Sequence, residues 1–393
     1  MQAGTFAETL YNAFRKEYNG DESLDFYIEK ITQKQNLSVE EACAAMRILV
    51  SGRASEFQQG AFLTAMYKKE PTIDEIAAFA YTLRELAVQI KIKSGLFGFS
   101  KAALGDTCGT GGGPLETFNV STAIMFILAS AGIIIAKHGN RAITSKCGSA
   151  DVLEALGVNI NLEQKQVEEC ISKIGIGFIY APNFHKAFKN VQKVRKELPF
   201  PTIFNILGPL ANPAFSLKGD NRQVLGVNKP ELVEKMAEVL KRLNVKKAIV
   251  VHGYYNGHKD GMDELSTVGE TKVSELKEDG SIENHLYTPE EFGLKRAKPE
   301  DLIGGGPSEN AKILVNILKG EDKGPKRDLV LLNAAAGLYV CGKAKNIQEG
   351  IELAKKEIDS LRAYRKLEEL IKFSKKAKQR QVHLSNLKKK LEK

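Results

Sequence analysis

The chain has 393 residues, of which 43% are hydrophobic and 27% are charged, and its formal net charge is +9. This length fits two or three domains, and the composition excludes a disulfide-stapled miniprotein, a fibre and a largely disordered chain. Most of the charge lies in residues 374–393, which hold eight Lys or Arg and one Glu, so the rest of the chain is close to neutral. A basic tail differs from the basic groove that nucleic-acid binding requires.

Residues 1–92 are expected to form an all-helical domain. Ser38 and Glu41, and likewise Thr72 and Glu75, match the pattern of a capping box at a helix start. The first 22 residues lack the charged start and apolar core of a signal peptide, and the five cysteines form no C-x-x-C pair that would indicate zinc or a redox couple. We therefore expect a cytoplasmic protein.

From about residue 93 the pattern changes to short apolar runs, glycine-rich loops and helices, which predicts an α/β domain over residues 93–375. Residues 132–136, 176–181 and 246–253 are expected to be buried strands of a mainly parallel central sheet flanked by helices. Residues 117–136 carry no charge, but polar residues open this stretch and a glycine interrupts it. We interpret it as a helix followed by a strand rather than as a membrane span.

A glycine-rich loop, residues 109–113 (GTGGG), follows a strand that is predicted to end near Asp106. Glycines allow positive φ and the close approach of an anion, so the N–H groups of such a loop can bind phosphate. The loop has neither the G-K-[ST] of a Walker A motif nor the full G-x-G-x-x-G dinucleotide pattern. A plain tight turn explains these residues equally well when they are considered alone.

Two predicted helix starts follow this loop and the next one. Residues 119–122 (NVST) and 146–149 (KCGS) place hydroxyl and free N–H groups at the positive end of a helix dipole, which attracts anions. Asn119 or Ser121 could equally be a simple helix cap. Lys137 and Arg141 add positive charge in the loop between them. Two such sites side by side predict one ligand with two phosphoryl centres.

Three other polar residues are candidates for chemistry. His138 lies where an apolar run becomes a loop, and a structural histidine is the simpler interpretation of it. Asp263 and Glu264 follow the strand at 246–253 and could hold Mg²⁺, although loop carboxylates are more often only solvated. Residues 345–375 are expected to be helical, and residues 376–393 to form a basic tail that is a solvated or frayed helical extension.

Four segments, in this order and spacing, resemble the anthranilate phosphoribosyltransferase family of tryptophan biosynthesis: GDTCGTGGGPLETFNVST, AKHGNRAITSKCGSADVLEALG, VQKVRKELPFPTIFNILGPLANP and DGMDELS. The similarity extends from about Leu24 to Phe373. It implies a small helical domain beside a large α/β domain, with the active site in the cleft between them. It further implies a segment near 161–190 that returns to the helical domain, and a homodimer formed through that domain.

The resemblance also implies site residues. The positions that match those binding phosphoribosyl pyrophosphate are Gly109, Gly112, Gly113, Thr117, Asn119, Val120, Ser121, Thr122, Lys137, His138, Gly139, Asn140, Arg141, Ala142, Ile143, Thr144, Ser145 and Ser149. The positions that match those contacting anthranilate are Gly109, His138, Asn140 and Arg195, and the Mg²⁺ ligands match Ser121, Asp263 and Glu264. A guanidinium such as that of Arg195 can pair with the carboxylate of anthranilate.

The activity implied by the resemblance is transfer of the 5-phosphoribosyl group to the amine of anthranilate, with release of pyrophosphate. An aniline-type amine is already neutral at pH 7, so no residue is assigned as a general base. Mg²⁺ is the expected cofactor, and the expected partners are small-molecule substrates and a second copy of the chain. We expect neither a membrane nor a nucleic acid as a partner.

The sequence departs from the family pattern at two points. Gly113 stands where the family has Asp, in GTGGD, and this change is expected to weaken metal handling. Residues 198–201 (LPFP) replace a Gly and an Arg before Thr202, which removes a cation and stiffens the loop. Three alternatives stay open: a phosphoribosyltransferase with another aromatic amine or base as acceptor, a nucleoside phosphorylase of the same fold, and a non-enzymatic nucleic-acid-binding relative.

Overall fold

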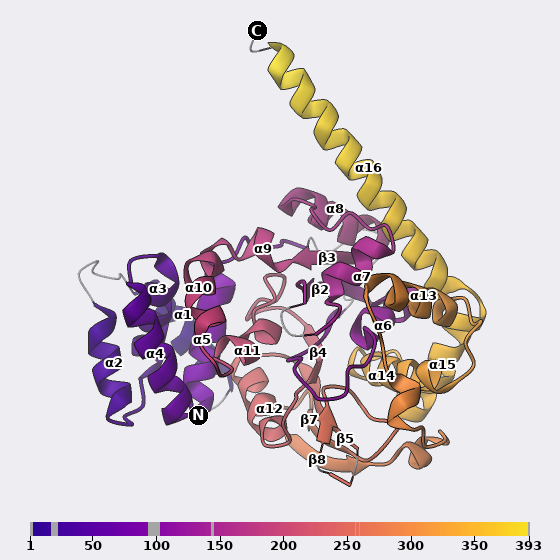
Figure 1. Cartoon of the computed structure of the whole chain (residues 1–393), viewed down its shortest axis with the longest axis horizontal. Coiled ribbons are helices and arrows are strands. Elements are labelled where there is room, and N and C mark those ends of the chain that lie inside the picture. The colour runs from indigo at the N-terminus through magenta and orange to yellow at the C-terminus, as the bar shows by residue number, and fades with distance from the viewer. Residues whose placement is uncertain are drawn as a thin grey trace.

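In a computed structural model the chain forms a helical part and an α/β part that lie side by side (Figure 1). The structure describes residues 3–16, 23–92, 103–142, 145–255, 257–258 and 260–391. Two predicted site residues, Ile143 and Thr144, and the last two residues of the basic tail lie outside the described residues. The expected fold class, a helical domain beside an α/β domain with a mainly parallel sheet, is confirmed.

The helical part contains α1 (Ala3–Arg15), α2 (Leu24–Thr32), α3 (Val39–Ser51), α4 (Glu56–Lys69) and α5 (Ile73–Leu86). Both predicted capping boxes are present, because Ser38 accepts from the N–H of Glu41 and Thr72 from that of Glu75. The apolar core of these five helices continues into the α/β part through α12 (Leu232–Arg242). α1, which lies outside the family resemblance, packs on α3, α5 and α12 and so joins the two parts.

The α/β part is built on one sheet with the strand order β3-β2-β1-β4-β5-β7-β8, and β6 pairs with β5. Strands β3, β2, β1, β4 and β5 are parallel, whereas β6, β7 and β8 are antiparallel to their neighbours. The strands are β1 (Leu104–Gly109), β2 (Ile134–Gly139), β3 (Ile176–Tyr180), β4 (Asn221–Gly226), β5 (Lys247–Tyr255), β6 (Asp260–Met262), β7 (Thr271–Leu276) and β8 (Ile282–Tyr287). β1 therefore continues three residues beyond Asp106, where its end was predicted.

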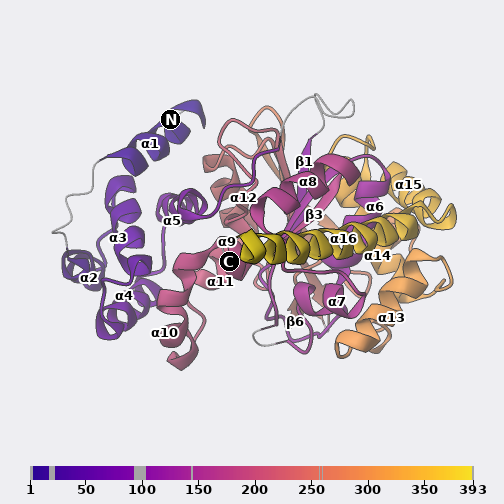
Figure 2. The same ribbon diagram turned by 90° about the horizontal axis from the view of Figure 1, so that it is seen from above.

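Helices cover both faces of this sheet (Figures 1 and 2). Leu225 of β4 and Val250 of β5 belong to the core shared with α12, while the alternate residues Val224 and Val251 belong to a core with residues of α14 on the other face. The other α-helices of this part are α6 (Val120–Ser130), α7 (Ser149–Ala155), α8 (Gln164–Ile174), α9 (Ala181–Phe184), α13 (Pro307–Leu318), α14 (Pro325–Val340), α15 (Ile347–Asp359) and α16 (Arg362–Leu391).

The charge-free stretch at residues 117–136 divides into α6 and the start of β2, as predicted. Nearly all of α6 is buried between the sheet and α14, which explains why it carries no charge. Among the described residues, no helix is both long and apolar enough to cross a membrane.

The segment that returns to the helical part lies later in the chain than expected. A 3₁₀ helix at Lys186–Val191 packs on α3, α10 (Gln192–Glu197) packs on α4, and α11 (Phe204–Leu207) packs on α5. The expected range of 161–190 is wrong over most of its length, because α8 covers β3 and α16 instead. The buried face of α8, Val167, Cys170 and Ile171, fits against the sheet rather than the helical core.

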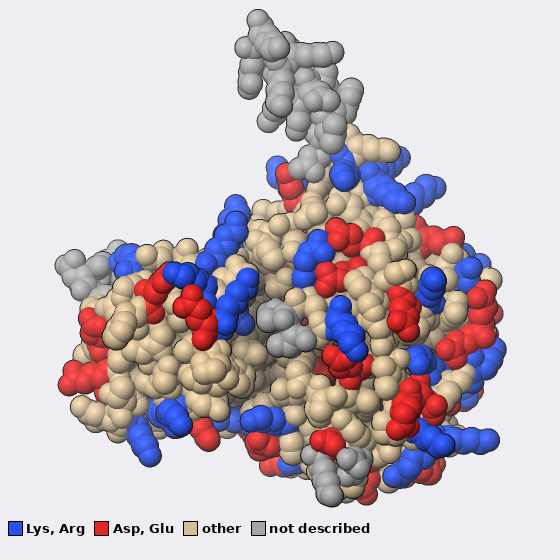
Figure 3. Space-filling view, in the orientation of Figure 1, with Lys and Arg blue, Asp and Glu red and all other residues tan. Residues whose placement is uncertain are grey.

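The basic tail continues α16, whose backbone is helical to Leu391 and which projects beyond the α/β part (Figure 1). The apolar face that holds this helix on the body includes Leu367, Leu370 and Ala377. On the face in Figure 3, basic and acidic side chains alternate over both parts of the described surface, without a continuous basic groove.

Candidate active site at the carboxyl ends of the parallel strands

Most of the predicted site residues that the structure describes lie where the parallel strands end, whereas Arg195 lies on α10. Because β2, β1, β4 and β5 are parallel neighbours, their carboxyl ends meet at one edge of the sheet, and the loops after them lie together. Gly109 at the end of β1 is in register with Gly226 at the end of β4, and the N–H of Thr110 donates to the Gly226 carbonyl at 3.0 Å. Gly111 and Gly112 follow with φ of 65° and 80°, which favours glycine.

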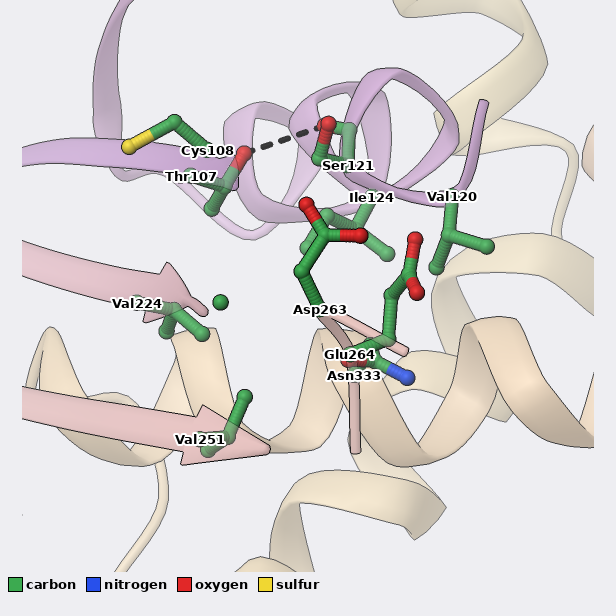
Figure 4. A pocket seen from close by; sticks show the side chains of 11 residues that line it. Thr107, Cys108, Val120, Ser121, Ile124, Val224, Val251, Asp263, Glu264 and Asn333 are labelled. Carbon is green, nitrogen blue, oxygen red and sulfur yellow. Dashed lines mark hydrogen bonds between the residues drawn. The ribbon is translucent and has the colours of Figure 1, made fainter. Parts of the chain in front are cut away.

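Asp263 and Glu264 are brought together with Ser121, as the resemblance implied. The three residues line a cavity of ≈ 20 Å³ with Thr107 and Asn333, which leaves room for about one water-sized group. Figure 4 shows the two carboxyl groups side by side, pointing toward the start of α6 and Ser121. The N–H of Gly111 donates to Asp263 Oδ2 at 2.8 Å, so one N–H of the glycine-rich loop is already used within the protein.

The carboxyl group of Glu264 is only partly satisfied. Its Oε1 accepts from the Thr117 hydroxyl at 3.2 Å, whereas its Oε2 is buried without a hydrogen-bond donor. Burial and the neighbouring Asp263 raise the pKa of Glu264 well above its ordinary value, and burial also raises the pKa of Asp263. A divalent cation at this place would stabilise both charged forms and supply the missing partner.

The residues present therefore fit Mg²⁺. Among the described residues, no three His, Cys, Asp or Glu side chains form a cluster that could enclose a metal by themselves. Two carboxylates and one hydroxyl are a small set of hard oxygen ligands, and Mg²⁺ is typically held by one or two carboxylates together with water and substrate phosphates.

Glycines at three strand ends allow the chain at Asp263 and Glu264 to approach this closely. A Cβ atom on Gly109 would overlap the Asp263 carboxylate, and one on Gly226 would overlap the Asp263 carbonyl oxygen. A Cβ atom on Gly253 would lie 2.5 Å from the Glu264 carbonyl oxygen. Gly226 and Gly253 were not predicted from the sequence, although each glycine follows an apolar run that is typical of a strand, which was a usable signal.

Gly113, where the family has Asp, lies against the β5–β6 hairpin. A Cβ atom there would be 2.9 Å from the carbonyl oxygen of Gly261, in the strand that leads directly to Asp263. Backbone therefore closes the space into which a longer side chain at 113 would extend.

Lys137 lies beneath the start of α6 with only 1% of its surface exposed. Its ammonium group donates to the Thr107 carbonyl at 2.5 Å and to Ser121 Oγ at 3.2 Å. Burial lowers its pKa, while the charge of the buried Asp106 acts in the opposite direction. Asp106, which also accepts from the side chain of Asn212 at 2.9 Å, is a site-supporting residue that the sequence analysis did not find.

Asn119 precedes α6, but its side chain does not cap the helix. Its amide donates to the Cys147 carbonyl at 3.0 Å and accepts from the side chain of Asn310 at 2.9 Å. It therefore connects the loop after β1 to the loop after β2 and to α13. Thr117, Val120 and Thr122 lie around the same helix start, with Thr122 fully buried.

The second expected anion site is occupied by the protein's own groups. The carboxylate of Asp151 accepts from the N–H of Ala142 at 2.9 Å and from that of Gly148 at 3.0 Å, at the start of α7. Arg141 pairs with Asp151 at 2.8 Å and Glu154 at 2.9 Å. These acidic residues thus pair with Arg141 and accept N–H groups at the start of α7. The binding of an anion by Arg141 and by this helix start stays a prediction.

Other members of the loop after β2 lie close to the strand ends. A Cβ atom on Gly139 would overlap the Ser149 hydroxyl, and that hydroxyl donates to the Asn140 carbonyl at 3.3 Å. The Asn140 side chain accepts from the N–H of Arg141 at 2.8 Å. Ser145 is exposed beside them.

Arg195 lies on α10, away from the acidic pair. Its guanidinium lies over the Phe204 ring at 4.8 Å, and burial alone lowers its pKa to about 10. Within the described part of the chain it forms no ion pair, so this half-buried cation has no acidic partner. Such a group is suited to the carboxylate of a ligand.

A row of rings connects Arg195 to the end of β2. Phe204 packs edge-on against Phe188 at 5.6 Å, Phe188 stacks on His185 at 4.8 Å, and His185 lies 4.9 Å from His138. Burial lowers the pKa of His138 well below its ordinary value and that of His185 to about 4, so both rings are neutral at pH 7. The row spans from the α/β part to the segment that packs on the helical part.

Comparisons with known proteins agree with this architecture. The model of the glycosyl transferase family α/β domain matches residues 101–364, and the helical bundle domain of that family matches residues 26–87. Anthranilate phosphoribosyltransferase from Petrotoga mobilis is 47% identical over 350 residues, which are 89% of this chain and 96% of the relative. The enzyme of the same name from Acetivibrio thermocellus is 49% identical over 347 residues, or 88% and 95% of the two chains.

Solved structures give the same result. The crystal structure of anthranilate phosphoribosyltransferase from Thermus thermophilus matches with a TM-score of 0.80 and 41% identity, covering 88% of this chain and 99% of that one. The Saccharomyces cerevisiae enzyme in complex with phosphoribosyl pyrophosphate and Mg matches with a TM-score of 0.79 and 27% identity, covering 90% and 98%.

Proposed function

This chain belongs to the anthranilate phosphoribosyltransferase family, and we propose that it transfers the 5-phosphoribosyl group of phosphoribosyl pyrophosphate to the amine of anthranilate in tryptophan biosynthesis. One observation carries the proposal. In the proposed site, a buried, incompletely satisfied carboxylate pair forms one end, and the half-buried guanidinium of Arg195, which has no acidic partner among the described residues, forms the other. The first end suits a metal-bound pyrophosphate, and the second suits the carboxylate of anthranilate.

The proposed roles follow from the positions of the groups. Ser121, Asp263 and Glu264 hold Mg²⁺, which, when bound, neutralises charge on the pyrophosphate. The glycine-rich loop, the start of α6 and the loop after β2 bind phosphoribosyl pyrophosphate. Lys137 supports this end by fixing the hydroxyl of Ser121. Arg195, with Asn140 and His138, orients the acceptor.

The reaction forms one C–N bond and breaks one C–O bond at C1 of the ribosyl group. The amine nitrogen of anthranilate attacks C1, pyrophosphate leaves with the electron pair of the C–O bond, and the nitrogen then releases a proton. We assign no general base, since the attacking amine is neutral at pH 7. Catalysis by this chain rests on orientation of the two substrates and on stabilisation of the charge of the leaving group.

We also propose that the chain acts as a homodimer that associates through its helical part. An apolar groove lined by residues of α2, α4 and α10 supports this proposal, and Phe57 of α4, one of the lining residues, has 87% of its surface exposed. Sedimentation of the wild-type chain and of Phe57→Asp tests this proposal. The substitution is expected to shift the protein from a dimer toward a monomer.

The domain division stays a proposal. We propose a helical domain over residues 1–92 with a returning segment at 186–207, and an α/β domain over 93–375. The packing of α10 and α11 on the helical core supports this division. Residues 376–393 form the basic tail. We place the enzyme in the cytoplasm, because its phosphorylated substrate is too polar to cross a membrane unaided.

The activity is tested by following the loss of anthranilate fluorescence on addition of phosphoribosyl pyrophosphate and Mg²⁺. Turnover is expected with anthranilate, and other aromatic amines and bases are assayed in parallel as acceptors. Turnover with another acceptor alone would instead assign the chain to a related phosphoribosyltransferase. A salt-sensitive shift in thermal stability with single-stranded nucleic acid, and none with the substrate and Mg²⁺, would contradict enzymatic function.

A further inference from the structure

A buried asparagine lies beside the acidic pair, on a helix far away in the sequence. Asn333 belongs to α14 and has only 3% of its surface exposed. It lines the same cavity as Ser121, Asp263 and Glu264, and Figure 4 shows it directly next to Glu264. No role for it was predicted from the sequence.

The amide oxygen and nitrogen of Asn333 both form hydrogen bonds, most of them with the backbone of one residue. Its Oδ1 accepts from the N–H of Leu265 at 3.0 Å, and its Nδ2 donates to the carbonyl of Leu265 at 3.0 Å and to that of Leu329 at 2.9 Å. Asn333 therefore binds both backbone groups of the residue that follows Glu264, much as a neighbouring strand would.

This arrangement is unusual for the helix that carries it. The middle of α14 is otherwise apolar and buried, with Leu329, Leu331, Leu332 and Ala334 around the asparagine. An amide in such surroundings destabilises the protein unless each of its polar atoms has a partner. A Leu side chain would fill the same space without needing hydrogen-bond partners. Packing alone therefore does not explain an asparagine at this position.

The same helix also contacts the other side of the cavity. α14 packs closely on α6, which carries Ser121, and a Cβ atom on Gly337 of α14 would lie 2.7 Å from a methyl group of Leu128 of α6. α14 thus touches the elements that supply both the hydroxyl and the carboxylates. A shift of α14 relative to the turn at Leu265 would alter the separation of the three oxygen ligands.

We propose that Asn333 is a positioning residue that holds Glu264 in reach of Mg²⁺ by binding the backbone of Leu265. This inference rests on the proposed role of the acidic pair and goes beyond it. Asn333 itself touches neither substrate nor metal in this role. Residues that orient metal ligands commonly change metal affinity by about 10- to 100-fold when they are replaced.

The test uses Asn333→Leu in the full chain, which is close in volume and removes all three hydrogen bonds. Thermal unfolding is measured against Mg²⁺ concentration at a fixed concentration of phosphoribosyl pyrophosphate, without anthranilate. The Mg²⁺ concentration for half of the maximal stabilisation is expected to rise about tenfold. In turnover assays kcat should fall, while KM for anthranilate should stay within about twofold of the wild-type value.

Asn221→Leu is the matched control. Asn221 is also buried, with 1% of its surface exposed, and its amide donates to the Ser216 carbonyl at 2.5 Å. It lies at the amino end of β4, opposite the acidic pair. This variant is expected to unfold at a lower temperature but to keep the wild-type Mg²⁺ dependence.

Asn333→Ala gives a second variant in case Asn333→Leu does not fold. It removes the same three hydrogen bonds without adding bulk or charge, so a similar rise in the half-saturating Mg²⁺ concentration is expected. Wild-type Mg²⁺ dependence in either folded Asn333 variant would overturn the role of Asn333. Absence of any Mg²⁺-dependent stabilisation in the wild-type chain would instead overturn the proposed metal role of Asp263 and Glu264.

Discussion

The metal end and the acceptor end of the proposed site are built in different ways. At the metal end, backbone from β1, β4 and β5 approaches Asp263 and Glu264 so closely that Cβ atoms on three glycines would have no room. At the acceptor end, Arg195 extends from a helix of six residues and rests on a row of aromatic rings. Close backbone contacts therefore restrict the metal end, whereas side chains alone build the acceptor end. We infer that the metal end serves phosphoribosyl transfer, and that the acceptor end selects the acceptor.

Replacement of Glu264 should have the largest effect on activity. Glu264→Gln keeps the shape of the side chain but removes the charge that binds Mg²⁺, so kcat/KM is expected to fall by about 10³-fold. Steady-state fluorescence assays at saturating Mg²⁺ measure this. Activity close to that of the wild-type chain would show that the acidic pair is not the metal site.

Gly109→Ala should disturb the metal end through the backbone. The added methyl group would overlap the Asp263 carboxylate, so we expect a loss of about 1–3 kcal/mol in unfolding free energy together with a higher Mg²⁺ requirement. Gly306→Ala is the control, because its Cβ atom would meet nothing within 4 Å. Equal effects of the two substitutions on Mg²⁺ dependence would show that close backbone packing does not determine the geometry of the metal end.

Arg195→Ala should act at the acceptor end only. Loss of a charge-assisted pair with the anthranilate carboxylate is expected to raise KM for anthranilate by about 10- to 100-fold. KM for phosphoribosyl pyrophosphate should change little. Arg195→Lys keeps the charge but not the planar guanidinium, so its KM for anthranilate should lie between that of the wild-type chain and that of Arg195→Ala. A change in both KM values alike would mean that the two ends are not separate.

Gly113→Asp tests the departure from the family pattern and should have a smaller effect. The family residue is expected to impair this chain, since the Gly261 carbonyl lies 2.9 Å from the added Cβ atom and β6 leads into Asp263. A rise of a few-fold in the half-saturating Mg²⁺ concentration is the expected result. Tighter Mg²⁺ binding by this variant would indicate that the loop accommodates the carboxylate after all.

The smallest effect concerns stability and pH in the absence of metal. Because the folded protein raises the pKa of Glu264 above 4.5, the folded state binds this proton more tightly than the unfolded state. The wild-type chain should therefore lose stability relative to Glu264→Gln as pH rises above the ordinary pKa of a glutamate, about 4.5. Below that pH the two should be alike. Denaturant unfolding at several pH values measures the difference, and a constant difference would contradict the buried charge.

Local residue patterns were enough to predict the capping boxes at Ser38 and Thr72, the glycine-rich loop and the identity of the family. These features depend on residue types at short spacing, which the sequence displays directly. The pairing of Arg141 could not be predicted in this way. Its partners Asp151 and Glu154 lie ten and thirteen residues later, and only the turn of the chain into α7 brings them within 3 Å.

The sequence by itself determined the class of chemistry, because the motifs supply the residue types that bind a phosphorylated sugar, a metal and a carboxylate. Only the tertiary structure decided how these residues work together. The order of strands places Gly226 beside Gly109, and the packing of α14 places Asn333 beside Leu265, 68 residues earlier in the chain. Such contacts depend on which elements become neighbours in space, and the spacing of residues along the chain does not predict this.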